Sequence, residues 1–207
     1  MGFATGNKTA RDWALRHRIV IAALVLALLS LVLELAGSGA TEALRYQRDA
    51  VAGGELWRLF SANVVHLGLA HWAMNALALV LIAALFAGSV SLPRWLAGGL
   101  GSGLAVTLGL HAFNPALHWY VGLSGLLHGL LAVGLVATLA NRRRPDWLIL
   151  AAGLIVKLGW EQAGGALPGS TALAGGEVIV DAHLYGAFGG TAAALLARGW
   201  EHARRSV

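Results

Sequence analysis

Long apolar runs separated by short polar segments form the dominant pattern of this 207-residue chain. A helix needs about 20 apolar residues to cross a bilayer, and six runs approach that length. The uncharged run 95–141 is too long for one crossing, and the turn signal Asn114-Pro115 divides it in two. The pattern therefore predicts six transmembrane helices. They cover residues 19–36, 69–88, 95–112, 121–140, 147–164 and 182–200, and the last is the least apolar because it is rich in Ala and Gly.

Composition agrees with a membrane protein. Charged residues make up 12% of the sequence, against roughly 25% in a typical soluble domain. One all-α integral membrane domain, residues 19–200, then accounts for nearly the whole chain, between an N-terminal segment 1–18 and a tail 201–207. The chain has no cysteine, which excludes disulfides, thiolate metal ligands and a cysteine nucleophile.

The basic residues predict the orientation of the helices. With six crossings, both termini and the loops 89–94 and 141–146 share one side of the membrane. That side carries most of the 15 Lys and Arg residues, namely Lys8, Arg11, Arg16, Arg18, Arg94, Arg142, Arg143, Arg144, Arg198, Arg204 and Arg205. The positive-inside rule therefore places both termini in the cytoplasm. Because these residues flank spans instead of forming one patch, we expect contact with the lipid bilayer and no nucleic acid.

Small residues predict close helix packing. In lipid, helices associate where small side chains let their backbones approach, as in the G-x-x-x-G pattern. Three such pairs lie on different predicted spans: Gly99 and Gly103, Gly125 and Gly129, and Gly186 and Gly190. We expect a compact bundle with tight crossings.

Polar residues within the predicted spans, or just before them, gather at one membrane face. They lie at the starts of spans two, four and six, which share the outer side, and they are His66, His71, Asn75, Ser124, His128 and His183. One helical turn advances about 5.4 Å, so all of them lie within about two turns of the outer surface. Polar groups at such depth are costly and usually functional. We expect them to line one shallow cavity.

These residue types suit nucleophilic catalysis. Ser124 becomes a nucleophile when a base takes its proton, and a histidine is the usual base. His71 and Asn75 are four residues apart, hence on one helical face, and both can donate hydrogen bonds to an oxyanion. Gly122 and Gly125 flank Ser124 and allow a substrate close to the backbone.

The sequence offers no convincing acidic third member for this site. Asp181 is two residues from His183 and points elsewhere on a helix. Lys157 and Glu161 are one turn apart in the fifth span, and their spacing predicts an ion pair with a structural role.

Three motifs give a specific resemblance. Trp57-Arg58 followed by His66, His71 and Asn75 resembles the rhomboid protease pattern of a Trp-Arg loop and H-x4-H-x3-N. Residues 122–125 resemble the G-x-S-G of that family, and residues 182–190 resemble its final-helix A-H-x-x-G-x-x-x-G. The motifs occur in family order on predicted spans two, four and six.

The resemblance implies a six-transmembrane-helix, rhomboid-like bundle that cleaves transmembrane segments. Ser124 would be the nucleophile and His183 the general base, while His71, Asn75 and the Ser124 amide would bind the oxyanion. Trp57 and Arg58 would belong to the membrane-embedded first loop, and the Gly122, Gly125 and Gly186 positions would support the active site. The substrate would be a membrane-anchored protein, and neither a metal nor a cofactor is expected.

One departure indicates a branch of the family. Many rhomboids carry a Tyr four residues after the nucleophile, where this chain has His128. G-x-S-G-x-x-H-G in a short chain is similar to the rhombosortases, which are associated with processing C-terminal Gly-Gly-containing membrane tails of exported bacterial proteins. That resemblance implies a bacterial inner membrane location with the site open to the periplasm, and it leaves the role of His128 open.

Two other classes of function remain open. The histidines could bind haem or a metal in a binding or transport protein, although the chain has no H-E-x-x-H and no evident inverted repeat. A catalytically inactive rhomboid-like chaperone is disfavoured because both Ser124 and His183 are present. The sequence makes no prediction of the oligomeric state, the cleavage position, or hydrolysis against transfer to an acceptor.

Overall fold

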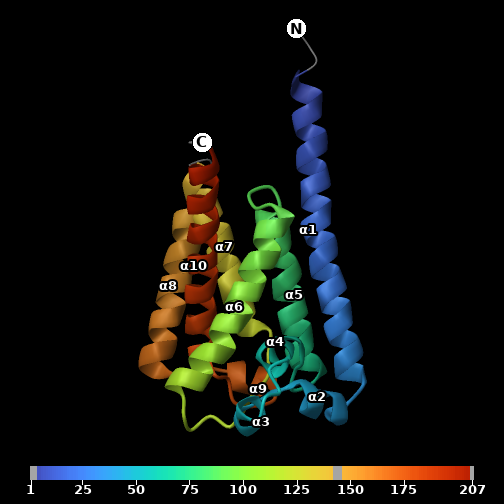
Figure 1. Cartoon of the computed structure of the whole chain (residues 1–207), viewed down its shortest axis with the longest axis vertical. Helices are drawn as coiled ribbons and strands as arrows, with labels where there is room; N and C mark the ends of the chain where they lie inside the picture. The colour runs from blue at the N-terminus through green and yellow to red at the C-terminus, as the bar shows by residue number, and fades with distance from the viewer. Residues whose placement is uncertain (1–3, 142–145, 206–207) are drawn as a thin grey trace.

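Long helices, labelled in Figure 1, form most of the fold. The computed structural model describes residues 4–141 and 146–205, and six helices in these ranges have 18 residues or more. They are α1 (Ala4–Leu35), α5 (Leu69–Phe86), α6 (Leu92–Phe113), α7 (Ser124–Asn141), α8 (Trp147–Gly164) and α10 (Val180–Arg205). Each of the six apolar segments predicted from the sequence is a helix. Because α1 begins at Ala4 and α10 ends at Arg205, the predicted flanking segments 1–18 and 201–207 are largely continuations of these two helices.

In the described part of the chain, three helices are long and apolar enough to cross a membrane. They are residues His17–Leu35 of α1, α5 and α6, and a shorter apolar stretch, Ser124–Thr138, lies in α7. Large apolar side chains on α1 point away from the bundle, and Leu28 and Leu35 are 60% and 67% exposed. Such a surface is typical of helices that contact lipid. The chain is therefore a multi-pass membrane protein, whereas the full count of six crossings stays a prediction.

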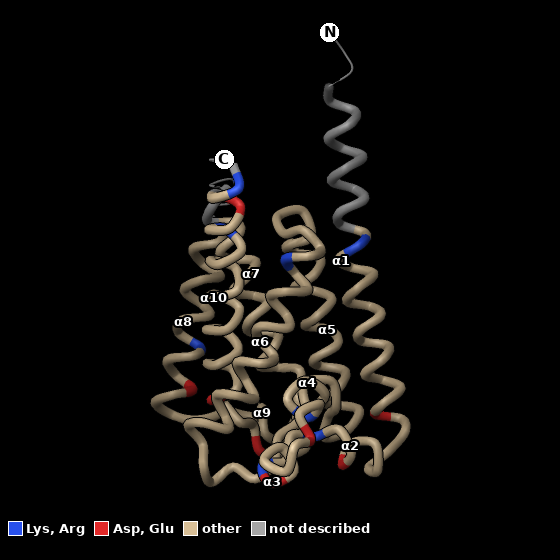
Figure 2. The backbone as a smooth tube through the Cα atoms, in the orientation of Figure 1, with Lys and Arg blue, Asp and Glu red and all other residues tan. Residues whose placement is uncertain are grey.

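Both termini lie at the same end of the bundle (Figure 1). The short helices α2 (Ser38–Leu44), α3 (Arg48–Ala52), α4 (Arg58–Ser61) and α9 (Ser170–Ala174) and the 3-10 turn η1 (Ala62–Val64) gather at the opposite end. Most acidic positions are found at that opposite end (Figure 2). Arg142, Arg143 and Arg144, which contribute to the orientation argument, lie outside the described residues.

A small two-stranded sheet adds to the helices. Strand β1 (Tyr46–Gln47) pairs antiparallel with β2 (Trp119–Tyr120), with Tyr46 opposite Tyr120. Beside it, the Arg48 guanidinium donates hydrogen bonds to the carbonyls of Leu110, His111, Asn114 and Leu117. The carbonyls of Leu110 and His111 belong to the last turn of α6, and those of Asn114 and Leu117 belong to the loop that follows it. The first loop is thereby tied to the segment that leads into α7.

Glycines place α7 directly against α10. A Cβ on Gly186 would overlap the carbonyl of Gly125, and a Cβ on Gly190 would overlap the carbonyl of Gly129. Only glycine permits this approach, which agrees with the packing predicted for these two pairs. The pair on α6 packs differently, because Gly103 faces the Asn63 side chain and Gly99 makes an ordinary contact with Leu130.

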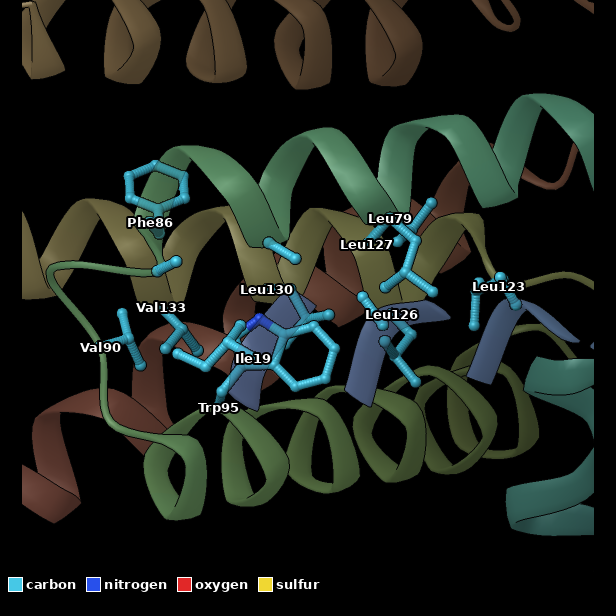
Figure 3. Close-up of a cluster of buried hydrophobic side chains, with 14 of the residues drawn as sticks. Ile19, Leu79, Phe86, Val90, Trp95, Leu123, Leu126, Leu127, Leu130 and Val133 are labelled. Atoms are coloured by element: carbon cyan, nitrogen blue, oxygen red, sulfur yellow. The ribbon is translucent and has the colours of Figure 1, made fainter. Parts of the chain in front are cut away.

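The apolar core surrounds α7. Leu126, Leu127 and Leu130 of this helix contact buried side chains from its neighbours (Figure 3). These neighbours include Ile19 of α1, Leu79 and Phe86 of α5 and Trp95 of α6. The first residue of α7, Ser124, is thus held on a helix that is fixed on several sides.

Candidate active site

Ser124 and His183 lie within hydrogen-bond distance. Ser124 is the first residue of α7 and follows Gly122, whose φ of 134° favours glycine. His183 lies in the first turn of α10 and is 5% exposed. The Oγ atom of Ser124 is 2.9 Å from Nε2 of His183. The two residues proposed from sequence as nucleophile and base, 59 positions apart, are thus brought together at the crossing of α7 and α10.

The other nitrogen of His183 defines its tautomer. His183 Nδ1 lies 2.9 Å from Glu161 Oε2. An ionised carboxylate only accepts hydrogen bonds, so Nδ1 carries the hydrogen and donates it. The lone pair of Nε2 is then directed at the Ser124 hydroxyl. This is the arrangement that a general base requires.

Glu161 is a residue of the site that the sequence pattern did not indicate. It was expected only to pair with Lys157, and that pair is present, with Lys157 Nζ 2.6 Å from Glu161 Oε1. However, the Glu161 side chain is buried and also contacts His183, from a helix 22 positions earlier in the chain. The available signal was a lone acidic residue inside a predicted span, which is costly without a function.

His71 and Asn75 face the same space from α5. The backbone N–H of Leu67 donates to His71 Nδ1 at 3.3 Å, so a neutral His71 carries its hydrogen on Nε2 and can donate it. Asn75 is 6% exposed, and its Nδ2 has no hydrogen-bond partner among the described residues. Two side chains that can donate hydrogen bonds therefore line the same cavity as Ser124.

A cavity of about 350 Å³ connects these groups. It is bounded by α5, α7, α8, α9 and α10, and its polar lining consists mainly of Ser124, His183, His71, Asn75, His128, Lys157, Glu161 and Ser170. The remaining wall is apolar and includes Met74, Leu127 and Leu173. A cavity with apolar walls and a few convergent polar groups is the usual form of a site that binds its substrate by shape and orients it by hydrogen bonds.

His128 packs on the proposed base. Its ring is stacked on that of His183, with centroids 4.2 Å apart and an interplanar angle of 21°. Its Nδ1 lies 2.7 Å from the Ser124 carbonyl and donates a hydrogen bond to it. His128 thus connects the nucleophile and the base through one stack and one hydrogen bond.

Trp57 and Arg58 lie away from this cavity. The buried Arg58 guanidinium bonds Glu55 Oε2 at 2.6 Å and the carbonyls of Glu42 and Arg45 at 2.8 and 2.9 Å. Trp57 is 53% exposed and lines a separate apolar cavity beside α1 and α6. Both residues lie in the segment between α1 and α5, where Arg58 holds the backbone through the carbonyls of Glu42 and Arg45.

His66 supports His71 from the segment before α5. The two rings meet edge to face with centroids 5.1 Å apart, and His66 is 2% exposed. Burial, with a smaller contribution from His71, lowers the pKa of His66 to about 3. This ring is therefore neutral near pH 7 and packs as an uncharged group.

One group of side chains resembles a metal site. Ligand atoms of His128, Glu161 and His183 lie within 4.8 Å of one another. However, the Lys157 ammonium already occupies one oxygen of Glu161, and Ser124 occupies Nε2 of His183. A metal ion would have to displace both contacts. This set of side chains therefore fits hydrogen bonding and proton transfer better than metal binding.

Comparisons with known proteins match the chain to one family. A profile of the rhomboid domain covers residues 53–200. The chain is 33% identical over 89 residues to the putative rhomboid protease YdcA of Bacillus subtilis (strain 168), covering 43% of this chain and 45% of that protein. It is 32% identical over 97 residues to the rhomboid protease GluP of the same organism, covering 47% of this chain and 19% of that protein. The aligned region thus spans less than half of either relative.

Proposed function

The chain belongs to the rhomboid family, and from that premise we propose that it is an intramembrane serine endopeptidase. Ser124 is the nucleophile and His183 is the general base. The observation that carries the proposal is the 2.9 Å contact between Ser124 Oγ and the lone pair of His183 Nε2 at the wall of the cavity.

The reaction follows from this geometry. As Oγ of Ser124 bonds to the substrate carbonyl carbon, its proton passes to His183 Nε2. The tetrahedral intermediate then expels the amine, which takes the proton from Nε2 and leaves an acyl group on Ser124. A water molecule attacks this ester while its proton passes to His183 Nε2. The second tetrahedral intermediate then releases the carboxylic acid, and the proton returns from Nε2 to Ser124 Oγ, which restores the hydroxyl.

Two side chains are placed to stabilise the oxyanion. His71 and Asn75 line the same cavity as Ser124, and Asn75 Nδ2 has no hydrogen-bond partner among the described residues. Preorganised donors of this kind lower the barrier because they need no rearrangement as charge develops. The backbone N–H of Ser124, at the start of α7, is a third donor of the proposed set.

We place the site near the periplasmic face of a bacterial inner membrane. His183 lies 22 residues before the end of α10 at Arg205, which is about 33 Å along a helix. The site is therefore in the half of the bundle opposite the termini, and the positive-inside rule puts the termini in the cytoplasm. A substrate segment would enter from the lipid and unwind within the cavity.

The proposed substrates are C-terminal Gly-Gly-containing membrane tails of exported proteins. The support is the rhombosortase-like pattern with His128 and the apolar cavity. Glycine unwinds from a helix at less cost than other residues, by roughly 0.5–1 kcal/mol relative to Ala. A Gly-Gly segment would therefore reach Ser124 in an extended form more readily than a Leu-rich helix.

The test is cleavage of a co-expressed reporter with such a tail. We expect cleavage by the wild type and none by Ser124→Ala or His183→Ala. Ser89→Ala, in the turn between α5 and α6, is the matched control and keeps full cleavage. Equal cleavage with and without Ser124 would refute the mechanism, and a folded wild type that cuts no membrane tail would favour the inactive, substrate-binding alternative. A second reporter with Leu-Leu in place of Gly-Gly tests the substrate class separately.

A further inference from the structure

We propose that Glu161 is a positioning residue for His183 and that Lys157, by binding the other carboxylate oxygen, fixes the orientation of Glu161 toward the imidazole. This inference rests on the proposed function and adds two residues to it. The family pattern that the sequence resembles has only a serine and a histidine at this point. In this chain, the structure places a carboxylate behind the histidine.

The two oxygens of Glu161 have different partners. Oε1 accepts from Lys157 Nζ at 2.6 Å, and Oε2 accepts from His183 Nδ1 at 2.9 Å. Lys157 Nζ is also 3.4 Å from His183 Nδ1, but both atoms carry hydrogens, so this is proximity and not a bond. The carboxylate is therefore held at both oxygens, one by each neighbouring group.

Burial separates this arrangement from an ordinary helix ion pair. Lys157 and Glu161 are one turn apart on α8 and could pair at the lipid or water surface. Instead, the Glu161 side chain is 2% exposed and is directed toward α10, which lies beside α8 (Figure 1). A buried carboxylate is costly unless its partners compensate for lost solvation. Here one of those partners is the proposed catalytic base.

The carboxylate has two effects on the reaction. It keeps the hydrogen of the neutral imidazole on Nδ1, so Nε2 is free to accept the Ser124 proton. It also faces the imidazolium that forms when Nε2 is protonated, and opposite charges at this distance attract strongly in a low-dielectric site. No proton moves to Glu161 in this scheme. The same logic holds in serine proteases that use a third, acidic residue.

Lys157 makes the test sharp. In Glu161→Gln, the ammonium still requires an acceptor, so it holds the amide oxygen and leaves the amide NH₂ facing His183. That NH₂ donates to Nδ1, which forces the hydrogen of the imidazole onto Nε2. The ring then presents a hydrogen, not a lone pair, to Ser124. We therefore expect kcat to fall on the order of 10³-fold with KM little changed.

Removing the ammonium should relieve this effect. In Lys157→Met the side chain no longer requires the amide oxygen, so in the double variant with Glu161→Gln the amide group can turn and accept from Nδ1. We expect Glu161→Gln to cost about tenfold or less in kcat when it is introduced into Lys157→Met. Such strong non-additivity is the signature of a direct coupling between the two sites. If Lys157 and Glu161 formed only a structural ion pair, its removal would lower the unfolding temperature and leave kcat of the folded protein unchanged.

The experiment measures kcat and KM on the reporter segment with purified protein, together with the unfolding temperature. The matched control is Glu42→Gln, which makes the same chemical change on a side chain that is 69% exposed. Selective ¹⁵N labelling of histidine in the Ser124→Ala background reads the tautomer of His183 directly, and we expect the hydrogen to move from Nδ1 to Nε2 in Glu161→Gln. An active wild type with an equally active Glu161→Gln variant, or an unchanged tautomer, overturns this inference and leaves the proposed protease standing. A folded wild type that does not cleave the reporter, or cleavage that persists in Ser124→Ala, overturns the proposed protease itself.

Discussion

The rings of His128 and His183 are stacked with their centroids 4.2 Å apart, and His128 also bonds the carbonyl of Ser124. A stacked aromatic pair stabilises a protein by about 0.5–1.5 kcal/mol beyond the burial of its surface, and the net contribution of a hydrogen bond to stability is similar. Because both contacts act on the proposed nucleophile and base, their loss should affect the reaction more than the fold.

We therefore expect His128→Ala to lower kcat about tenfold, with the protein still folded. His128→Tyr keeps an aromatic ring over His183 and should retain more activity than His128→Ala. Reporter cleavage and unfolding temperature, measured for both variants, check this prediction. Full activity of His128→Ala would show that the stack and the hydrogen bond are dispensable.

Asn75 provides a test of the oxyanion site. Asn75 lines the cavity, and its buried Nδ2 has no hydrogen-bond partner among the described residues. Removal of one preorganised donor costs about 10²–10³ in kcat in other hydrolases. We expect Asn75→Ala to lose activity in this range with a nearly unchanged KM, measured on the same reporter. A loss confined to KM would instead assign Asn75 to substrate binding.

The sequence predicted most of this arrangement because membrane helices have a strong local signal. Apolar runs located all six helices, and motif order indicated that residues of α5, α7 and α10 would meet. The contact of Glu161 with His183 was missed because it depends on how α8 is rotated against α10, which no local pattern encodes. The pairing of Tyr46 with Tyr120 was missed for a different reason, because two-residue strands have no detectable periodicity.

The crossing of α7 and α10 gives a prediction about stability. A Cβ on Gly186 would overlap the carbonyl of Gly125, which is backbone and cannot move aside. Gly199 is on the same helix, and a Cβ there would meet nothing within 4 Å. Gly186→Ala should separate the helices and lower the unfolding temperature, whereas Gly199→Ala should be neutral or stabilising by up to about 1 kcal/mol. Thermal unfolding in detergent compares the two, and equal effects of both substitutions would argue against a tight crossing at Gly186.

The buried His66 gives the pH dependence a defined sign. Burial lowers the pKa of His66 to about 3 in the folded protein, whereas the unfolded chain exposes the ring at its ordinary pKa of about 6.5. Between these values the unfolded state binds a proton that the folded state does not, so the contribution of His66 to stability is fully present above about pH 6.5 and is lost as the pH falls.

The expected slope from this residue is at most about 1.4 kcal/mol per pH unit below pH 6.5. His66→Leu removes the titrating group and two ring nitrogens that have no hydrogen-bond partner among the described residues. Its free energy of unfolding should therefore decline less between pH 7 and pH 5 than that of the wild type, as measured by denaturant unfolding at several pH values. Parallel curves for the two proteins would mean that His66 is protonated, or exposed to water, in the folded state.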